Sequence, residues 1–262
     1  MRSHSVTEVF TLNIIAYLDR IGCPESIPLT VDGLQMVTQA HLRRVPFENL
    51  ALTDEGIEPS LETEDLFHKI VEQKRGGYCF ELNKLFGLLL QELGFDCRSV
   101  AARVINNRPE PCPLSHRAVV VNIDGKRYFC DVGFGGSGPK GILPLDDGPE
   151  QTVAGEPFHV SFEEDGIAFS CYENGQLWRV LKFRDEPWLD VDFATLNRYY
   201  ATYHRSPFRL KRILYIATED GWKSLIHDTF TRFAGGTHHV TNLDPAQIND
   251  VIEQEFHVVV PQ

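Results

Sequence analysis

The chain lacks three patterns that would place it in a familiar class at once. Its six cysteines include no Cys-x-x-Cys pair, so neither a zinc site nor a small disulfide framework is indicated. No run approaches about 18 apolar residues, and residues 1–30 include the acids Glu8 and Asp19 and no uninterrupted apolar core of the signal-peptide kind. These absences predict a cytoplasmic protein in a reducing compartment, without a membrane anchor.

Positive charge is also scarce. The chain has 25 Lys and Arg against 37 Asp and Glu, which gives a net charge of −12. Because phosphate backbones and anionic lipids are bound by clustered Lys and Arg, this balance argues against a nucleic-acid or membrane partner. The densest basic run is RSPFRLKR at residues 205–212, for which a solvated strand face and a functional role are equally plausible.

The period of the hydrophobic pattern changes along the 262 residues, and this change indicates three units. Apolar residues recur every three or four positions over residues 9–21, 34–45, 66–74 and 79–93, as in a helical bundle. From about 98 to 184 they alternate, and three hairpin signals (Asp124-Gly125, Asp165-Gly166, Asn174-Gly175) predict an antiparallel sheet or barrel. After Pro187 we expect a mixed segment: a helix at 192–203, a strand at 212–218, a turn at 220–221, a helix at 245–254 and a final strand.

The predicted fold is therefore α+β and multi-domain. Residues 1–95 form a helical domain, 96–188 an antiparallel β-barrel and 189–262 an α/β lid. A site built between the first two units lies at a domain junction, which is where clefts form.

The stretch RGGYCFELN at residues 75–83 ends a glycine-bearing loop and begins a strongly apolar helix, which puts Cys79 at the helix N-terminus. The positive end of a helix stabilises an anion, so a thiol held there loses its proton more readily than in solution. The thiolate is a nucleophile. The plainer alternative is that Cys79 is a small buried hydrophobic residue.

A histidine and an acid are brought together by the first hairpin. With Asp124-Gly125 as the turn, Ile123 faces Lys126 and Asp131 lies opposite the position two residues after His116, on the same face. A hydrogen bond between His116 and Asp131 is then feasible, and the other ring nitrogen is free to take a proton from Cys79. This is the nucleophile, base and orienter of a Cys-His-Asp triad with a cysteine-protease-like core. A shift of one residue in the register would separate the pair, and an accidental contact is the alternative.

Two other motifs are weaker. GFGGSG at residues 133–138 matches G-x-G-x-x-G, but prolines and a glycine follow where a dinucleotide site needs a helix, so we expect a flexible loop beside Asp131. His238, His239 and Asp228 suggest a metal site only superficially, because adjacent histidines on a strand point to opposite faces. We therefore expect no metal. Arg75 and Glu48 are expected to pair near the Cys79 loop, although an ordinary surface pair is equally plausible.

Several stretches together resemble the arylamine N-acetyltransferase family. The resemblance rests on residues 75–83, on Ser115-His116-Arg117 and on DVGFG at residues 131–135, with weaker similarity at 17–22, 34–50, 197–199 and 206–208. It is close in the first 140 residues and looser after about residue 150. Two departures, Cys23 in place of an aromatic residue and Pro113-Leu114-Ser115 before the histidine, leave acceptor preference open.

The resemblance implies roles for individual residues. Cys79 would accept an acetyl group from acetyl-CoA, with His116 as base and Asp131 as orienter. Acceptor-binding residues would be Phe47, Ser115 and Phe134, and coenzyme-binding residues would be Gly133, Tyr199, Ser206 and Phe208. The basic run near residue 205 would then help to hold the coenzyme phosphates.

The implied reaction is ping-pong transfer of the acetyl group to an arylamine, arylhydrazine or N-hydroxyarylamine. Such amines are unprotonated at neutral pH, unlike an alkylamine. The alternatives are a thiol hydrolase or an amide synthase with the same triad and, in a different class, a non-catalytic binding module.

Overall fold

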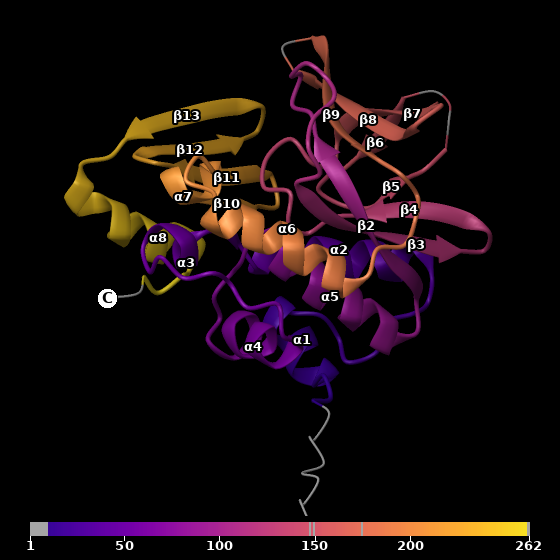
Figure 1. Ribbon diagram of the computed structural model, residues 1–262, viewed down its shortest axis with the longest axis horizontal. Coiled ribbons are helices and arrows are strands. Elements are labelled where there is room, and N and C mark those ends of the chain that lie inside the picture. The colour runs from indigo at the N-terminus through magenta and orange to yellow at the C-terminus, as the bar shows by residue number, and fades with distance from the viewer. Residues whose placement is uncertain (1–9, 147, 149, 174, 261–262) are drawn as a thin grey trace, which may run out of the picture.

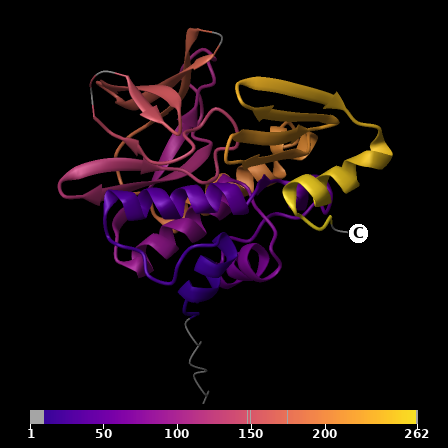
Figure 2. The ribbon, with the colours of Figure 1, turned by 180° about the vertical axis from the view of Figure 1, so that it is seen from behind.

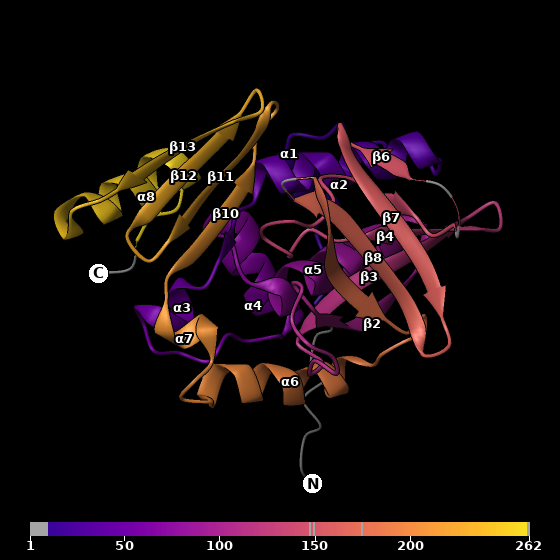
Figure 3. The same ribbon diagram turned by 90° about the horizontal axis from the view of Figure 1, so that it is seen from above.

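The computed structural model describes residues 10–146, 148, 150–173 and 175–260 of the chain. A layer of helices from the first part of the chain supports two separate antiparallel sheets that stand side by side above it (Figure 1). Seen from above, helix α5 lies between the two sheets, and α6 runs along one edge of the molecule, next to α7 (Figure 3). Within the described residues, no helix has the length and apolar character needed to cross a membrane.

The helices are concentrated at the two ends of the chain. Their bounds are α1 Ile14–Ile21, α2 Val31–Arg44, α3 Leu50–Thr53, α4 Thr63–Phe67, a π-helix His68–Glu72, α5 Cys79–Leu93, α6 Asp190–Thr202, α7 Pro207–Leu210, a 3-10 turn Pro245–Gln247 and α8 Ile248–Phe256. Helix α2 runs beneath the larger sheet towards the smaller one (Figure 2) and contacts strand β10.

Helix α5 has the bounds that the hydrophobic period predicts. It begins at Cys79, where the Glu81 carboxylate accepts a hydrogen bond from the Tyr78 N–H at 3.0 Å, and it ends at Gly94, whose φ of 100° is in the left-handed region. Its phenylalanines and most of its leucines are completely buried, whereas Leu88 and Leu93 are half-buried. Because α5 packs against β2 and β3, its first residue is fixed relative to the larger sheet.

The larger sheet has eight strands in the order β5-β4-β3-β2-β9-β8-β7-β6, which form a nearly closed antiparallel barrel. The strand bounds are β2 Asp96–Val104, β3 His116–Ile123, β4 Lys126–Cys130, β5 Leu143–Pro144, β6 Gln151–Val153, β7 Glu156–Glu163, β8 Gly166–Glu173 and β9 Gln176–Phe183. The expected turn joins β3 to β4: Asp124 and Gly125 both have positive φ (49° and 76°), as a type I′ turn requires. The pairing runs from Ile123 opposite Lys126 to Val119 opposite Cys130, which confirms the predicted register.

The smaller sheet combines the two ends of the chain. Its order is β1-β10-β11-β12-β13, with β1 Phe47–Glu48, β10 Ile213–Ala217, β11 Gly221–Ile226, β12 Thr229–Ala234 and β13 Thr237–Asn242. Helix α8 buries one face of this sheet in a hydrophobic cluster of its own. The other face is turned towards the barrel (Figure 3).

Several sequence expectations need correction. The first helix starts at Ile14 instead of residue 9, which lies outside the described residues, because the Asn13 side chain caps the helix at the Ala16 N–H. The helix expected at 66–74 begins at Thr63 and changes to a π-helix at His68. The strand expected at the end of the chain is wrong, since residues 257–260 form none.

Other elements were missed. The alternation after residue 220 is too irregular to reveal β11, β12 and β13. The two-residue strand β1 lies in the unit expected to be helical, between the helices expected at 34–45 and 66–74. The hairpin signal at Asn174 lies outside the described residues. Strands β8 and β9 on either side of it are paired.

Candidate active site

The three residues of the expected triad come from three elements. Cys79 is the first residue of α5, His116 is the first residue of β3, and Asp131 directly follows β4. The His116 Nε2 and Asp131 Oδ2 atoms are 2.6 Å apart, and both side chains are almost completely buried. The hairpin register causes this contact, because it carries β4 to the position at which Asp131 lies diagonally from His116.

Cys79 contacts the same imidazole. Its sulfur is a hydrogen-bond partner of the His116 ring and lies 3.8 Å from the Ser115 carbonyl oxygen. Because Nε2 is bonded to Asp131, the nitrogen left for the sulfur is Nδ1. Burial of the ring opposes its protonation, but the charges of Asp131 and Cys79, with hydrogen bonds to both, outweigh burial and raise the pKa of His116 to about 10.

Asn83 fixes Asp131 and was not anticipated. Its amide nitrogen donates to Asp131 Oδ1 at 2.8 Å and to the Arg117 carbonyl at 2.6 Å, and its oxygen accepts from the Val132 N–H at 3.0 Å. The side chain is completely buried. The available signal was its spacing, since a residue four positions after Cys79 lies on the same face of the helix.

Glycine is required where the chain leaves Asp131. A Cβ on Gly133 would lie 2.8 Å from the Cys79 Cα and 3.0 Å from the Asn83 amide nitrogen. The backbone after β4 therefore packs directly on the start of α5. This close approach places the nucleophile and the orienter in one rigid unit.

A buried group of four charges lies under the Cys79 loop. The expected pair is present, with Arg75 Nη2 3.0 Å from Glu48 Oε1, and Glu48 is completely buried. Lys69, which was not anticipated, lies 2.8 Å from Glu81 and 3.8 Å from Glu48. Burial raises the pKa of Glu48, but Lys69, Arg75 and the Leu50 N–H outweigh it, so the net shift is downward.

One cavity of about 570 Å³ contains almost all the expected site residues. Its walls include Cys79 and His116 of the triad. They also include the acceptor candidates Phe47, Ser115 and Phe134 and the coenzyme candidates Gly133, Tyr199, Ser206 and Phe208. Tyr200, Tyr203, Arg108 and Arg205 complete this part of the wall. Asp131 lies behind His116 and does not line the cavity. The individual acceptor and coenzyme roles stay predictions.

Aromatic rings shape this cavity. The Phe134 ring meets His116 edge-on at 5.3 Å between centroids, and Tyr199 stacks on Tyr203 at 5.1 Å with 15° between the planes. Tyr200 donates from its hydroxyl to the Leu114 carbonyl at 3.1 Å, which ties α6 to the loop before His116. Sequence patterns did not indicate Tyr200 or Tyr203 as wall residues, because only the packing of α6 turns them inward.

The cavity also has two arginines without an acidic partner and one buried hydroxyl without a hydrogen bond among the described residues. Arg108 and Arg205 are exposed and form no ion pair with any acid in the described part of the chain. Ser206 is almost completely buried, and its hydroxyl has no hydrogen-bond partner among the described residues. In the part of the chain that the structure describes, no three or more His, Cys, Asp or Glu side chains are arranged to hold a metal ion.

The comparisons agree with this geometry. A family model described as N-acetyltransferase matches residues 30–262. The arylamine N-acetyltransferase of Mycobacterium tuberculosis (strain H37Rv) is 31% identical over 255 residues, which cover 95% of this chain and 90% of that protein. The Salmonella typhimurium arylamine N-acetyltransferase / N-hydroxyarylamine O-acetyltransferase is 32% identical over 260 residues, covering 92% and 87%.

Solved structures show the same relationship. The Mycobacterium marinum arylamine N-acetyltransferase in complex with CoA superposes with a TM-score of 0.89 at 28% identity, covering 94% of this chain and 93% of that one. The Salmonella typhimurium structure gives a TM-score of 0.90 at 28% identity, covering 97% and 94%. From the family match, the relatives and the shared fold, we conclude that this chain belongs to the arylamine N-acetyltransferase family of enzymes.

Proposed function

We propose that the protein transfers an acetyl group from acetyl-CoA, through an acetyl-cysteine at Cys79, to the nitrogen of an arylamine or arylhydrazine. The contact of Cys79 with a His116 ring that is bonded to Asp131, at the wall of one cavity, carries this proposal. The Salmonella relative is also named an N-hydroxyarylamine O-acetyltransferase. O-acetylation of N-hydroxyarylamines is therefore part of the proposal.

In the first half-reaction the Cys79 sulfur attacks the thioester carbonyl of acetyl-CoA. The bond between the acetyl carbon and the coenzyme sulfur breaks, and protonated His116 gives its proton to the leaving thiolate. The high pKa of His116 keeps this proton available at neutral pH. Because one thioester replaces another, the acetyl group on Cys79 stays activated.

In the second half-reaction the amine nitrogen attacks the acetyl-cysteine. Neutral His116 takes the proton from the nitrogen, and Cys79 leaves as a thiolate, which restores the starting charges. Asp131 holds the ring in place throughout and is held by Asn83. Coenzyme A leaves before the amine reacts, so the kinetics are expected to be ping-pong.

The cationic side of the cavity suits the coenzyme. Arg108 and Arg205 form no ion pair with an acid among the described residues, so they supply positive charge here although the protein as a whole is acidic. The free Ser206 hydroxyl and the stacked Tyr199 ring offer a hydrogen bond and a flat surface beside them. These groups match the phosphates and the ring of a nucleotide-containing thioester.

The division of the chain into three structural units is also part of this proposal. Residues 1–95, 96–188 and 189–262 would form a helical unit, a barrel unit and a lid, around a cysteine-protease-like core. The contribution of α6 to the cavity wall supports the lid, because Tyr199, Tyr200 and Tyr203 all come from it or its end. The cytoplasmic location expected from the sequence is likewise part of this proposal.

Intact-protein mass spectrometry after incubation with acetyl-CoA alone tests the mechanism. We expect one acetyl group, mapped to Cys79 and removed by aniline with formation of N-acetylaniline. Cys79→Ser should take up none, whereas the matched control Cys97→Ser, a half-buried thiol outside the cavity, should behave like the wild type. A wild-type protein without an adduct would contradict the proposal.

The same experiment separates the alternatives. A thiol hydrolase would consume acetyl-CoA at a rate independent of aniline, because water accepts the acyl group. An amide synthase would acetylate Cys79 poorly and accept a larger acyl thioester instead. A binding module would show neither adduct nor unusual reactivity of Cys79 towards iodoacetamide.

A further inference from the structure

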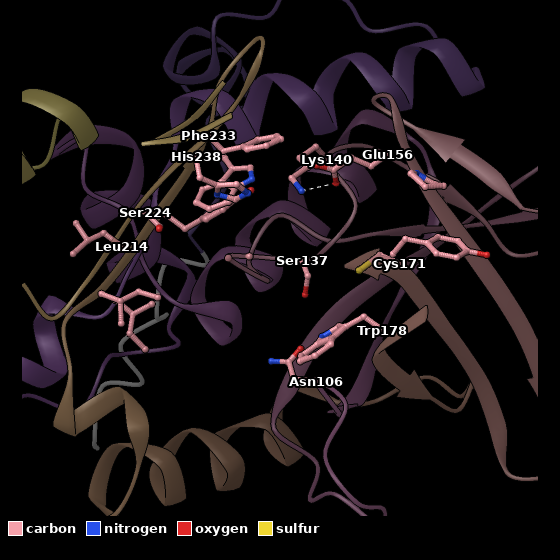
Figure 4. A pocket seen from close by; sticks show the side chains of 18 residues that line it. Asn106, Ser137, Lys140, Glu156, Cys171, Trp178, Leu214, Ser224, Phe233 and His238 are labelled. Carbon is pink, nitrogen blue, oxygen red and sulfur yellow. Dashed lines mark hydrogen bonds and ion pairs between the residues drawn. The ribbon is translucent and has the colours of Figure 1, made fainter. Parts of the chain in front are cut away.

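Helix α6 forms part of the wall of the active-site cavity but not of the cavity next to it. Tyr199 and Tyr200 of α6 and Tyr203 directly after it line the active-site cavity. The second cavity, of about 670 Å³, lies between the barrel and the smaller sheet (Figure 4), and none of the described residues that line it belongs to α6. A displacement of α6 would therefore change the wall of the active-site cavity and leave that of the second one.

Two buried cations hold the start of α6. Asp190, its first residue, lies 2.9 Å from Lys84 Nζ with one carboxylate oxygen and 2.8 Å from Arg117 Nη2 with the other. Lys84 and Arg117 are 8% and 4% exposed, and neither forms an ion pair with another acid among the described residues. Burial raises the pKa of Asp190, but the two cations outweigh it, so the net shift is downward. Loss of this carboxylate would leave two buried cations without a counter-charge.

A ring of α6 packs on the same arginine. The guanidinium carbon of Arg117 lies 4.4 Å from the centroid of the Phe193 ring, which is completely buried. Arg117 Nη2 also donates to Ser99 Oγ at 2.7 Å. Arg117 follows His116 in β3, and Lys84 lies in α5. The start of α6 is thus attached to the two elements that carry the base and the nucleophile.

The residue that precedes the nucleophile holds the middle of α6. The Tyr78 hydroxyl donates to Asn197 Oδ1, and the Asn197 amide nitrogen donates to the Pro59 carbonyl at 3.0 Å. Both the Tyr78 and the Asn197 side chains are buried. Tyr200, three residues after Asn197, lies on the same face of α6. This pair of hydrogen bonds therefore fixes the turn that presents Tyr200 to the cavity.

We propose that Tyr78 and Asp190 are positioning residues for the first half-reaction, which hold α6 against the elements that carry Cys79 and His116. This inference rests on the acetyl-transfer function proposed above. Neither Tyr78 nor Asp190 is among the residues that line the active-site cavity, so both act through α6.

The end of α6 lies beside the polar groups assigned above to the coenzyme. Tyr199 stacks on Tyr203, and Arg205 and Ser206 follow within three residues. A shift of α6 would displace this surface, whereas the contact of Cys79 with His116 does not involve α6. Weaker binding of acetyl-CoA with an unchanged reactivity of Cys79 is the expected consequence.

Two variants remove the contacts separately. Tyr78→Phe removes only the hydroxyl that binds Asn197, and Asp190→Asn removes the charge that Lys84 and Arg117 share. For each protein, the rate of Cys79 acetylation is measured by quenched-flow mass spectrometry at a series of acetyl-CoA concentrations. The rate of Cys79 alkylation by iodoacetamide reports the reactivity of the thiol, and urea unfolding reports stability.

Each variant has a matched control. Tyr17→Phe removes another buried hydroxyl, which lies 3.0 Å from His41 Nε2 and outside the cavity. Asp192→Asn removes an exposed carboxylate from the same first turn of α6. Both controls should keep the acetyl-CoA concentration that gives half-maximal acetylation, even where stability falls.

Tyr78→Phe and Asp190→Asn should raise this concentration by about fivefold or more, with the maximal acetylation rate and the alkylation rate within about twofold of the wild type. An unchanged concentration in the folded variants would overturn the inference, because the contacts would then serve stability alone. An equal fall in acetylation and alkylation would also overturn it, since the effect would lie at Cys79 itself. Failure of the wild type to acetylate Cys79 would instead refute the underlying function. If Asp190→Asn fails to fold, Tyr78→Phe still decides.

Discussion

Asp131 acts on the reaction through the charge and position of the His116 ring. Its carboxylate accepts from His116 with one oxygen and from Asn83 and the Gly133 N–H with the other. Both the orientation of the ring and its capacity to remain protonated therefore depend on this carboxylate.

Substituting Asp131 by asparagine tests this role. The amide keeps the size but removes the charge, so we expect the pKa of His116 to fall and kcat/KM for acetyl transfer to drop by about 10²–10⁴-fold. The pH profile of Cys79 alkylation by iodoacetamide should shift as well, which a purely structural defect would not cause.

The matched control is Asp185→Asn. Asp185 binds Arg98 and Arg127 on the barrel and does not line the active-site cavity, so its variant should retain the wild-type pH profile. Equal activity of Asp131→Asn and the wild type would contradict the role assigned to Asp131.

Among the secondary-structure elements, the π-helix His68–Glu72 positions a cation beneath the active-site loop. It places Lys69 within reach of two buried carboxylates, Glu48 and Glu81. Glu81 also caps the N-terminus of α5, so the cation supports the turn that presents Cys79. Burial raises the pKa of Glu81, and Lys69 only partly opposes this shift.

Lys69→Met should therefore destabilise the protein by about 3–5 kcal/mol, because it leaves buried acids without their shared cation. Urea unfolding measures the change. Lys69→Arg should recover part of it, and the exposed control Lys126→Met should alter stability by no more than about 0.5 kcal/mol. A loss below about 1 kcal/mol for Lys69→Met would show that Glu48 and Glu81 do not need this partner.

At the scale of the whole molecule, Asn49 connects the N-terminal helical part of the chain to the C-terminal segment that begins the smaller sheet. Its amide nitrogen donates to the Phe208 and Lys211 carbonyls at 2.8 and 2.7 Å, and its oxygen accepts from the Ile213 N–H at 2.7 Å. These bonds hold the start of the smaller sheet against the N-terminal part and thereby fix one side of both cavities.

Asn49→Ala should loosen this connection. We expect faster amide hydrogen exchange over residues 207–217, with little change in the barrel, because only the bonds to that segment are lost. The half-buried Asn122, which bonds to Asp96 and Arg98 at the edge of the barrel, supplies the control variant Asn122→Ala. Unchanged exchange at 207–217 would contradict the proposed link.

Global stability should depend on His41, which is buried in α2 and bonded to the Tyr17 hydroxyl at 3.0 Å. Burial lowers the pKa of His41 to about 3, whereas the unfolded chain titrates near about 6.5. Below about pH 6.5 the unfolded state binds the additional proton, so stability is lost as the pH falls from there towards about 3.

The predicted slope due to His41 is about 1.4 kcal/mol per pH unit, measured by urea unfolding between about pH 4 and 6. His41→Gln should flatten the profile in that window, whereas His204→Gln, at an exposed position, should not. Parallel profiles for the wild type and His41→Gln would contradict the prediction.

Local signals determined the parts of the site that could be predicted. The glycine-bearing loop and apolar period located Cys79 at the start of α5, and the Asp124-Gly125 turn set the register that joins His116 to Asp131. Asn83 and Lys69 were missed because their partners are distant in sequence. Local sequence patterns do not predict contacts between buried side chains that lie far apart in the chain.

The sequence by itself determined the helix bounds around Cys79, the hairpin and the family, because turn chemistry, capping and hydrophobic period act over a few neighbouring residues. Only the tertiary structure decided that β1 joins the C-terminal sheet and that Trp222 faces Trp178 across a cavity. Those arrangements depend on contacts between residues far apart in the chain, whose formation is governed by packing of the whole molecule.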